Sequence, residues 1–162
     1  MPPRVFIDTN TLVSGLLFVG NEAKLLNLAL DGKIKLVMSE QVVEETKRTL
    51  VEKFRLNPAI SSVVVVGWSK VAEIVDASRE EAEKFRGLVG AKDAKILTAA
   101  LKSKADFFIS GDKSFHQEKI KRMINVVTTR QFLKSRLIPE LERRCHEEER
   151  IPLQEVKKRL QK

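Results

Sequence analysis

Short apolar runs, separated by segments with helical periodicity, are the feature that most limits how this chain can fold. The runs at residues 5–7, 34–38, 106–110 and 124–127 are typical of buried strands, and residues 73–75 add a shorter one. Between them, residues 39–55 and 92–103 carry apolar side chains at helical spacing. Strands alternating with helices predict a parallel sheet. We therefore predict a three-layer α/β/α domain around a parallel sheet of four to five strands.

Capping and turn residues predict where the helices begin. Thr9 or Asn10 could cap a helix after the first strand, and Ser39 could cap the helix after the second. Asn57-Pro58 opens a further helical stretch, although the Val63–Val66 run within it also favours a strand. Ser78 with Glu81 predicts a capping box.

The excess positive charge of the chain is concentrated in its last third. Residues 113–162 carry 14 basic and 7 acidic side chains, a net charge of +7, whereas the whole chain of 162 residues has +8. The nearly all-charged segment after residue 138 predicts a domain at residues 1–138 and a charged helical tail at 139–162. A basic region attracts polyanions such as nucleic acid, although a solvated surface on a basic protein is an equal interpretation.

The number of cysteines and the length of the apolar runs indicate the cellular compartment in which this protein is expected. The single cysteine, Cys145, excludes a disulfide within the chain, and with two histidines it cannot make a classical zinc site. No apolar run approaches the roughly 20 residues that cross a bilayer, and the chain begins without a secretory signal pattern. We therefore expect a cytoplasmic protein that does not associate with membranes.

Four acidic residues fall where the predicted fold would bring them to one edge of the sheet. Asp8 and Asp112 follow strands, Asp93 begins a helix, and Glu45 lies on the helix after the second strand. That edge is where open α/β sheets place their active sites. Carboxylates about 4 Å apart repel by roughly 4 kcal/mol at an effective dielectric of about 20. Such a cluster needs shared protons or a hard divalent cation such as Mg²⁺ or Mn²⁺, which can bind phosphate and activate water.

Four segments, in this order, resemble the PIN-domain ribonucleases, most closely the prokaryotic branch of toxins from toxin–antitoxin pairs. The segments are Val5-Phe6-Ile7-Asp8-Thr9-Asn10, Ser39 through Leu50, Lys92 through Ala100, and Ala105 through Asp112. The resemblance covers about residues 4–133. It implies a metal-dependent endoribonuclease for single-stranded RNA, a homodimer, and an antitoxin protein that blocks the pocket.

The resemblance also implies a role for each site residue. Asp8, Glu45, Asp93 and Asp112 would form the acidic quartet. Asp8, Asp93 and Asp112 would bind Mg²⁺ or Mn²⁺, and Glu45 would act through a water or a second ion. The side chains that would orient these groups are Thr9, Asn10 and Ser110.

Several basic residues follow Asp112 closely, and we expect some of them to border the acidic pocket and contact RNA phosphates. They are Lys113, Lys119, Lys121, Arg122 and Arg130. A generic solvated face is the alternative interpretation of this group.

Other functions fit the sequence less well. A catalytically inactive PIN-like protein that binds RNA or acts as a scaffold is the main alternative. A phosphatase of the haloacid-dehalogenase type needs a second aspartate where this chain has Asn10. A dinucleotide-binding fold needs a Gly-rich fingerprint after the first strand, which is absent. Each acid also has a local explanation: Asp8 and Asp93 as helix caps, Asp112 as a turn residue, Glu45 as a solvated helix residue.

Overall fold

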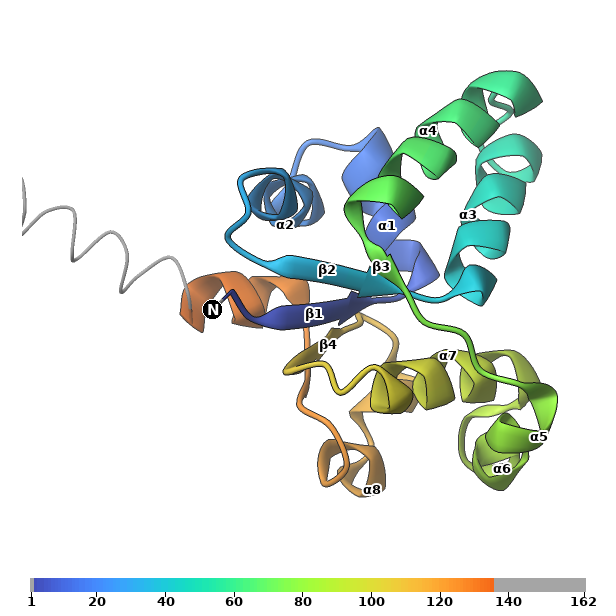
Figure 1. Cartoon of the computed structure of the whole chain (residues 1–162), viewed down its shortest axis with the longest axis vertical. Coiled ribbons are helices and arrows are strands. Elements are labelled where there is room, and N and C mark those ends of the chain that lie inside the picture. Colours follow the sequence, from blue (N-terminus) through green and yellow to red (C-terminus); the bar gives the residue numbers. More distant parts are fainter. Residues whose placement is uncertain (1, 136–162) are drawn as a thin grey trace, which may run out of the picture. The chain divides into compact units, whose positions relative to one another are not determined.

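The computed structural model describes residues 2–135, and their five strands form one parallel sheet (Figure 1). The strand order is β3-β2-β1-β4-β5. The strands are β1 (Arg4–Ile7), β2 (Lys35–Met38), β3 (Glu73–Ile74), β4 (Phe107–Ile109) and β5 (Val126–Val127). All four neighbouring pairs are parallel, so the predicted parallel sheet is confirmed.

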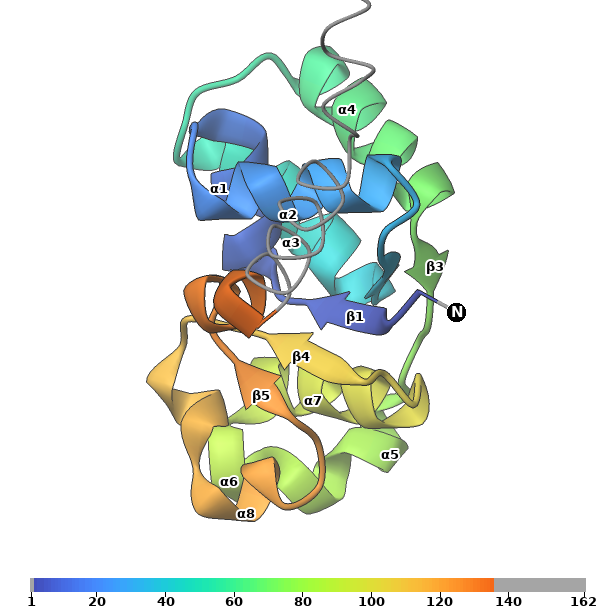
Figure 2. The same cartoon turned by 90° about the vertical axis from the view of Figure 1, so that its left-hand side faces the viewer.

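Helices cover both faces of this sheet, which confirms the predicted three layers (Figures 1 and 2). One face carries α1 (Thr9–Leu17), α2 (Asn21–Leu30), α3 (Glu40–Glu52) and α4 (Pro58–Val71). The other carries α5 (Arg79–Ala82), α6 (Arg86–Val89) and α7 (Ala91–Lys102). A short 3-10 helix (Lys113–His116) and α8 (Glu118–Lys121) connect β4 to β5. Within the described residues, no single helix is long and apolar enough to cross a bilayer.

Strand β1 lies at the centre of the sheet and is buried on both faces. Val5, Phe6 and Ile7 are fully buried, as expected for a central parallel strand covered by helices. The Phe6 ring packs edge-on against Phe108 of β4, with centroids 5.4 Å apart, and Phe108 packs in turn against Phe115 at 4.9 Å. This packing fixes the carboxyl end of β1, where Asp8 follows.

An ion-pair group ties the first residues of three strands together. Glu73 of β3 accepts two hydrogen bonds from the Arg4 guanidinium, at 2.8 and 2.9 Å, and pairs with the Lys35 ammonium at 2.9 Å. The Arg4 hydrogen bonds are the main cause that lowers the pKa of Glu73 to about 2. The group anchors the two-residue edge strand β3, which has few backbone hydrogen bonds of its own.

Helices α1 and α2 approach closely at Gly15. A Cβ atom at Gly15 would lie 2.6 Å from Leu26 Cδ1 and 3.0 Å from the Glu22 carbonyl oxygen. Any larger residue in this position would overlap α2.

Most predicted helix starts are confirmed, but the cap of α1 was wrong. Ser39, Asn57 and Ser78 cap their helices as predicted, and Ser78 forms the full capping box. Helix α1 is capped by Asp8 and not by Thr9 or Asn10, because an Asp8 oxygen accepts the Thr11 N–H at 2.9 Å. The chain thus enters the helix directly from β1, without an intervening turn.

The chain divides into two compact units, residues 1–129 and 130–162. The sheet and the helices named above belong to the first unit. Of the second, only residues 130–135 are described, and they are helical. The predicted tail at residues 139–162 lies outside the described residues, so the division at residue 138 stays a prediction.

Candidate active site

Asp8 is the buried centre of the candidate site. Its side chain accepts a hydrogen bond from the Ser110 hydroxyl on one oxygen and the Thr11 N–H on the other. Only 4 % of Asp8 is exposed. Burial raises the pKa of the Asp8 carboxyl, the two hydrogen bonds oppose that rise, and the charge of Asp112 adds to it. Asp8 is therefore held in one orientation at the carboxyl end of the central strand.

Ser110 links Asp8 to Asp112. The Ser110 hydroxyl oxygen accepts the Asp112 N–H at 3.1 Å while its proton goes to Asp8. The Asp112 carboxylate accepts the Ser114 N–H at 2.9 Å and so caps the 3-10 helix Lys113–His116. The His116 ring donates to the Ser110 carbonyl oxygen at 2.7 Å, since a carbonyl oxygen can only accept. Two predicted acids thus share one hydroxyl.

Glu45 is fixed by donors from three elements. It accepts hydrogen bonds from the Thr9 hydroxyl at 2.8 Å and the Gln41 amide at 2.6 Å, and the Lys92 ammonium lies 3.4 Å away. Burial alone would raise the pKa of Glu45, but the Gln41 and Thr9 hydrogen bonds and the Lys92 charge outweigh it and lower the pKa. Glu45 is therefore an ionised carboxylate at neutral pH, held in the pocket and not a freely solvated helix residue, the alternative that the sequence left open.

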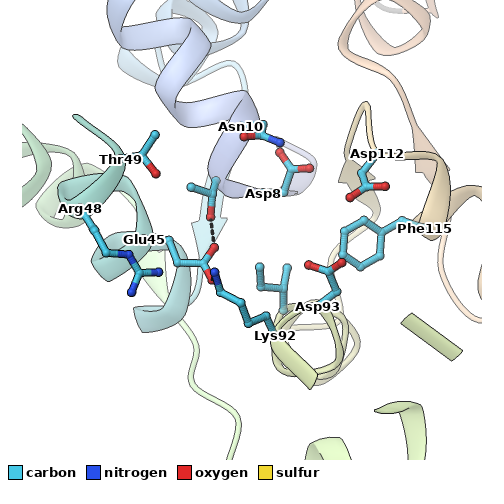
Figure 3. A pocket seen from close by; sticks show the side chains of 11 residues that line it. Asp8, Asn10, Glu45, Arg48, Thr49, Lys92, Asp93, Asp112 and Phe115 are labelled. Carbon is cyan, nitrogen blue, oxygen red and sulfur yellow. Dashed lines mark hydrogen bonds and ion pairs between the residues drawn. The ribbon is translucent and has the colours of Figure 1, made fainter. Parts of the chain in front are cut away.

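Asp93 lies in the first turn of α7, and Figure 3 shows its side chain on the same side of the pocket as Asp112. Burial raises its pKa, and the charges of Asp112, Glu45 and Asp8 raise it further. All four predicted acids are thus near enough to act on one another electrostatically.

One pocket of about 200 Å³ collects this group (Figure 3). It is lined by Asp8, Thr9, Asn10, Glu45, Arg48, Thr49, Lys92, Asp93, Ile96, Asp112 and Phe115. The structure therefore brings together the four acids predicted from sequence, with Thr9 and Asn10 beside them. Ser110 does not line the pocket and lies fully buried behind Asp8.

The cations that line the pocket are not those selected from the sequence. Arg48 and Lys92 are among its lining residues, whereas Lys113, Lys119, Lys121 and Arg122 are not. Arg130 belongs to the second unit of the chain. A signal for the missed pair existed, since Arg48 lies three residues after Glu45 on one helix and Lys92 directly precedes Asp93. Contact between RNA and these five basic residues, which were selected from the sequence, stays a prediction.

The donor chemistry of the pocket fits a hard divalent cation. The four acidic side chains of the pocket offer carboxylate oxygens, which are the ligands that Mg²⁺ and Mn²⁺ favour. Burial and then repulsion from the neighbouring acids raise the pKa of Asp93, and a bound cation would offset the unfavourable energy of its charge. Within residues 2–135, no three His, Cys, Asp or Glu side chains are already gathered closely enough to hold a metal ion. Binding would therefore require side-chain adjustment.

A family model described as "PIN domain" matches residues 4–114 of the chain. Among curated proteins, none matches the chain significantly.

Solved structures with a similar fold include a VapBC complex from Salmonella typhimurium bound to DNA, with 17% identity and a TM-score of 0.60. That match covers 80% of this chain and 99% of the other. VapBC2 from Rickettsia felis, bound to a DNA fragment from its promoter, has 15% identity and a TM-score of 0.57, covering 77% and 98%. VapC20 of Mycobacterium tuberculosis, a toxin that cleaves the sarcin–ricin loop, has 18% identity and a TM-score of 0.52, covering 69% and 94%. At these identities the likeness supports the fold alone.

Proposed function

The chain belongs to the PIN-domain family, and from that premise we propose that it is a metal-dependent endoribonuclease that cleaves phosphodiester bonds in single-stranded RNA. The observation that carries the proposal is the convergence of Asp8, Glu45, Asp93 and Asp112 from four separate segments into one pocket. Gathering four carboxylates in one pocket costs free energy, since Asp8 is buried, Glu45 and Asp93 are half-buried and like charges repel. A catalytic role for a cation and a phosphate accounts for that cost, whereas a role in folding does not.

Each residue of the pocket has a place in this proposal. Asp8, Asp93 and Asp112 would hold Mg²⁺ or Mn²⁺, which when bound supplies positive charge to stabilise the phosphate. Glu45, ionised and fixed by Thr9 and Gln41, would orient a water molecule for attack on phosphorus. Arg48 and Lys92 would contact phosphate oxygens at the rim.

We propose further that the protein is the toxin of a toxin–antitoxin pair. Two of the solved structures with this fold are VapBC complexes and a third is a toxin, which supports the proposal by fold. The expected partner is a protein that covers the acidic pocket. A homodimer and a cytoplasmic location remain predictions. Co-expression with the product of a small adjacent reading frame, followed by co-purification and loss of RNA cleavage, tests the pairing.

The nuclease activity is tested by cleavage of a labelled, unstructured RNA with Mn²⁺, with Mg²⁺ and with EDTA. Wild-type protein, Asp93→Asn and the control Asp31→Asn are prepared identically. Asp31 is an exposed residue at the end of α2, and its substitution removes the same charge as Asp93→Asn. We expect cleavage by wild type and Asp31→Asn that EDTA abolishes, and none by Asp93→Asn. Equal cleavage by all three proteins would indicate a contaminant or a wrongly assigned site. No cleavage by any, with salt-sensitive RNA binding, would favour the inactive RNA-binding scaffold.

A further inference from the structure

A second pocket, of about 180 Å³, lies beside the acidic one and has the opposite charge. Its lining residues come from α3 and from the segment Arg79–Lys95. They are Gln41, Arg79, Ala82, Glu83, Arg86, Ala91, Lys92, Ala94 and Lys95. Four of these side chains are cationic and one is a carboxylate.

Only part of this positive charge is neutralised by the protein. Lys92 is one of the paired cations, because its ammonium lies 3.4 Å from Glu45. Glu83 pairs with Arg86 at 3.6 Å, but both side chains are about 60 % exposed, so solvent screens the pair strongly. Neither Arg79 nor Lys95 forms an ion pair in the part of the chain that the structure describes. A concave surface with unpaired cations attracts anions.

The two pockets adjoin along α3 and the first turn of α7. Lys92 lines both of them. Gln41 lines the basic pocket and donates its amide hydrogen bond to Glu45, which lines the acidic one. A chain that occupies the acidic pocket can therefore continue over Gln41 and Lys92 into the basic pocket without crossing the body of the protein.

We propose that the basic pocket binds a backbone phosphate of the RNA strand next to the bond that is cleaved, an inference that rests on the proposed RNA substrate. Arg79 and Lys95 supply the charge that recognises the phosphate, and Lys92 bridges the two phosphates. Among the residues that the structure describes, the lining includes no aromatic side chain on which a base could stack. The pocket therefore positions the strand through its backbone and does not read its sequence.

Binding is tested with Arg79→Gln and Lys95→Gln, which each remove one charge without changing a residue that lines the acidic pocket. The matched control is Lys24→Gln, an exposed lysine on α2, across the sheet from α7. The probe is a labelled single-stranded RNA in EDTA, and the readout is fluorescence anisotropy at several salt concentrations. We expect each test variant to bind about 3- to 10-fold more weakly, with a salt slope shallower by about 0.7, and the control to change by less than about 2-fold.

Cleavage of a dinucleotide, which has only the scissile phosphate, separates this proposal from the proposed activity. In the presence of Mn²⁺, the test variants should cleave the dinucleotide like wild type but show a raised KM on a longer strand. A wild type that binds RNA with the expected charge dependence but cleaves neither substrate would overturn the nuclease and keep the phosphate site. A wild type that cleaves both, with Arg79→Gln and Lys95→Gln no weaker in binding than Lys24→Gln, would overturn the phosphate site and assign the pocket to an acidic protein segment.

Discussion

At the scale of single residues, the Ser110 hydroxyl joins two acids of the pocket by donating to Asp8 and accepting from the Asp112 N–H. Ser110→Ala removes both hydrogen bonds without adding volume. We expect cleavage to fall about 10- to 100-fold, the usual cost of losing a group that orients a metal ligand. The measurement is kcat/KM on labelled RNA across pH. Since the Ser110 hydrogen bond lowers the pKa of Asp8, its loss should move the acid limb of the profile to higher pH.

Ser110→Thr is the matched control, because threonine keeps the hydroxyl. It should retain most of the activity and the wild-type pH profile. An Ser110→Ala protein with full activity and an unmoved profile would show that Asp8 does not depend on this hydrogen bond.

Asp8 and Asp112 could be predicted because each follows a buried strand, at the edge where open α/β sheets place their sites. Glu45 and Asp93 lie on helices and were predicted mainly through the resemblance to the PIN-domain family. The cations could not be predicted, because many lysines and arginines satisfy the same pattern. Arg48 and Lys92 reach the pocket through the direction of their side chains on α3 and α7, which depends on how these helices pack. The cap of α1 was assigned to Thr9 or Asn10, and Asp8 was considered a cap only as an alternative to a role in the site; Asp8 does cap α1 and also lines the pocket.

At the scale of elements, Gly15 sets the closeness of α1 and α2. Gly15→Ala should lower the free energy of unfolding by about 1–3 kcal/mol, because its Cβ would overlap Leu26 and the Glu22 carbonyl. Gly67→Ala in α4 is the control, since a Cβ there would meet nothing within 4 Å. It should raise stability by about 0.5–1 kcal/mol through helix propensity. Urea denaturation measures both, and equal effects of the two variants would contradict this account.

The edge strand β3 depends on Glu73 and its two cations. The pKa of Glu73 is lowered to about 2 in the folded state, so its contribution to stability is present above the ordinary glutamate pKa of about 4.5 and is lost as pH falls toward 2. Glu73→Gln should cost about 0.5–1 kcal/mol at pH 7, because solvent screens this group. The variant should also lose less stability than wild type between pH 5 and pH 2.

Thermal unfolding at several pH values tests the role of Glu73. The control is Glu44→Gln, which breaks a looser pair with Lys47 at 3.6 Å and should change little. A Glu73→Gln protein with the acid sensitivity of wild type would exclude this ion-pair group as its source.

The presence of the strands and helices was easier to predict from the sequence than the residues at which they begin and end. Apolar runs and capping residues are local signals, and they located every strand of the sheet and the starts of α3, α4 and α5. The 3-10 helix Lys113–His116 and α8 were not predicted. Helices this short are stabilised by tertiary contacts and are too short to show a helical periodicity of apolar residues in the sequence.

At the scale of the whole molecule, repulsion among the acids couples the pocket to stability. Mn²⁺ that binds only the folded state should stabilise it by about 2.7 kcal/mol at 100 times its Kd, which raises Tm by about 5–10 °C. Asp93→Asn should abolish this shift. Without metal it should raise Tm, because the raised pKa of Asp93 means that its charge is unfavourable in the folded state. Asp31→Asn, the control, should keep the wild-type response, and a wild type that does not respond to Mn²⁺ or Mg²⁺ would contradict metal binding.

The place of β1 between β2 and β4 also determines when the pocket can exist during synthesis. Asp8 is among the first residues made, but β4 and Asp112 emerge about a hundred residues later, roughly 5–20 s at ordinary translation rates. Until then β1 has one neighbour, and Asp8 has no Ser110 to hold it. A nascent or prematurely ended chain that stops before β4 therefore carries Asp8, Glu45 and Asp93 without the completed pocket, and the proposed activity would require the later strands.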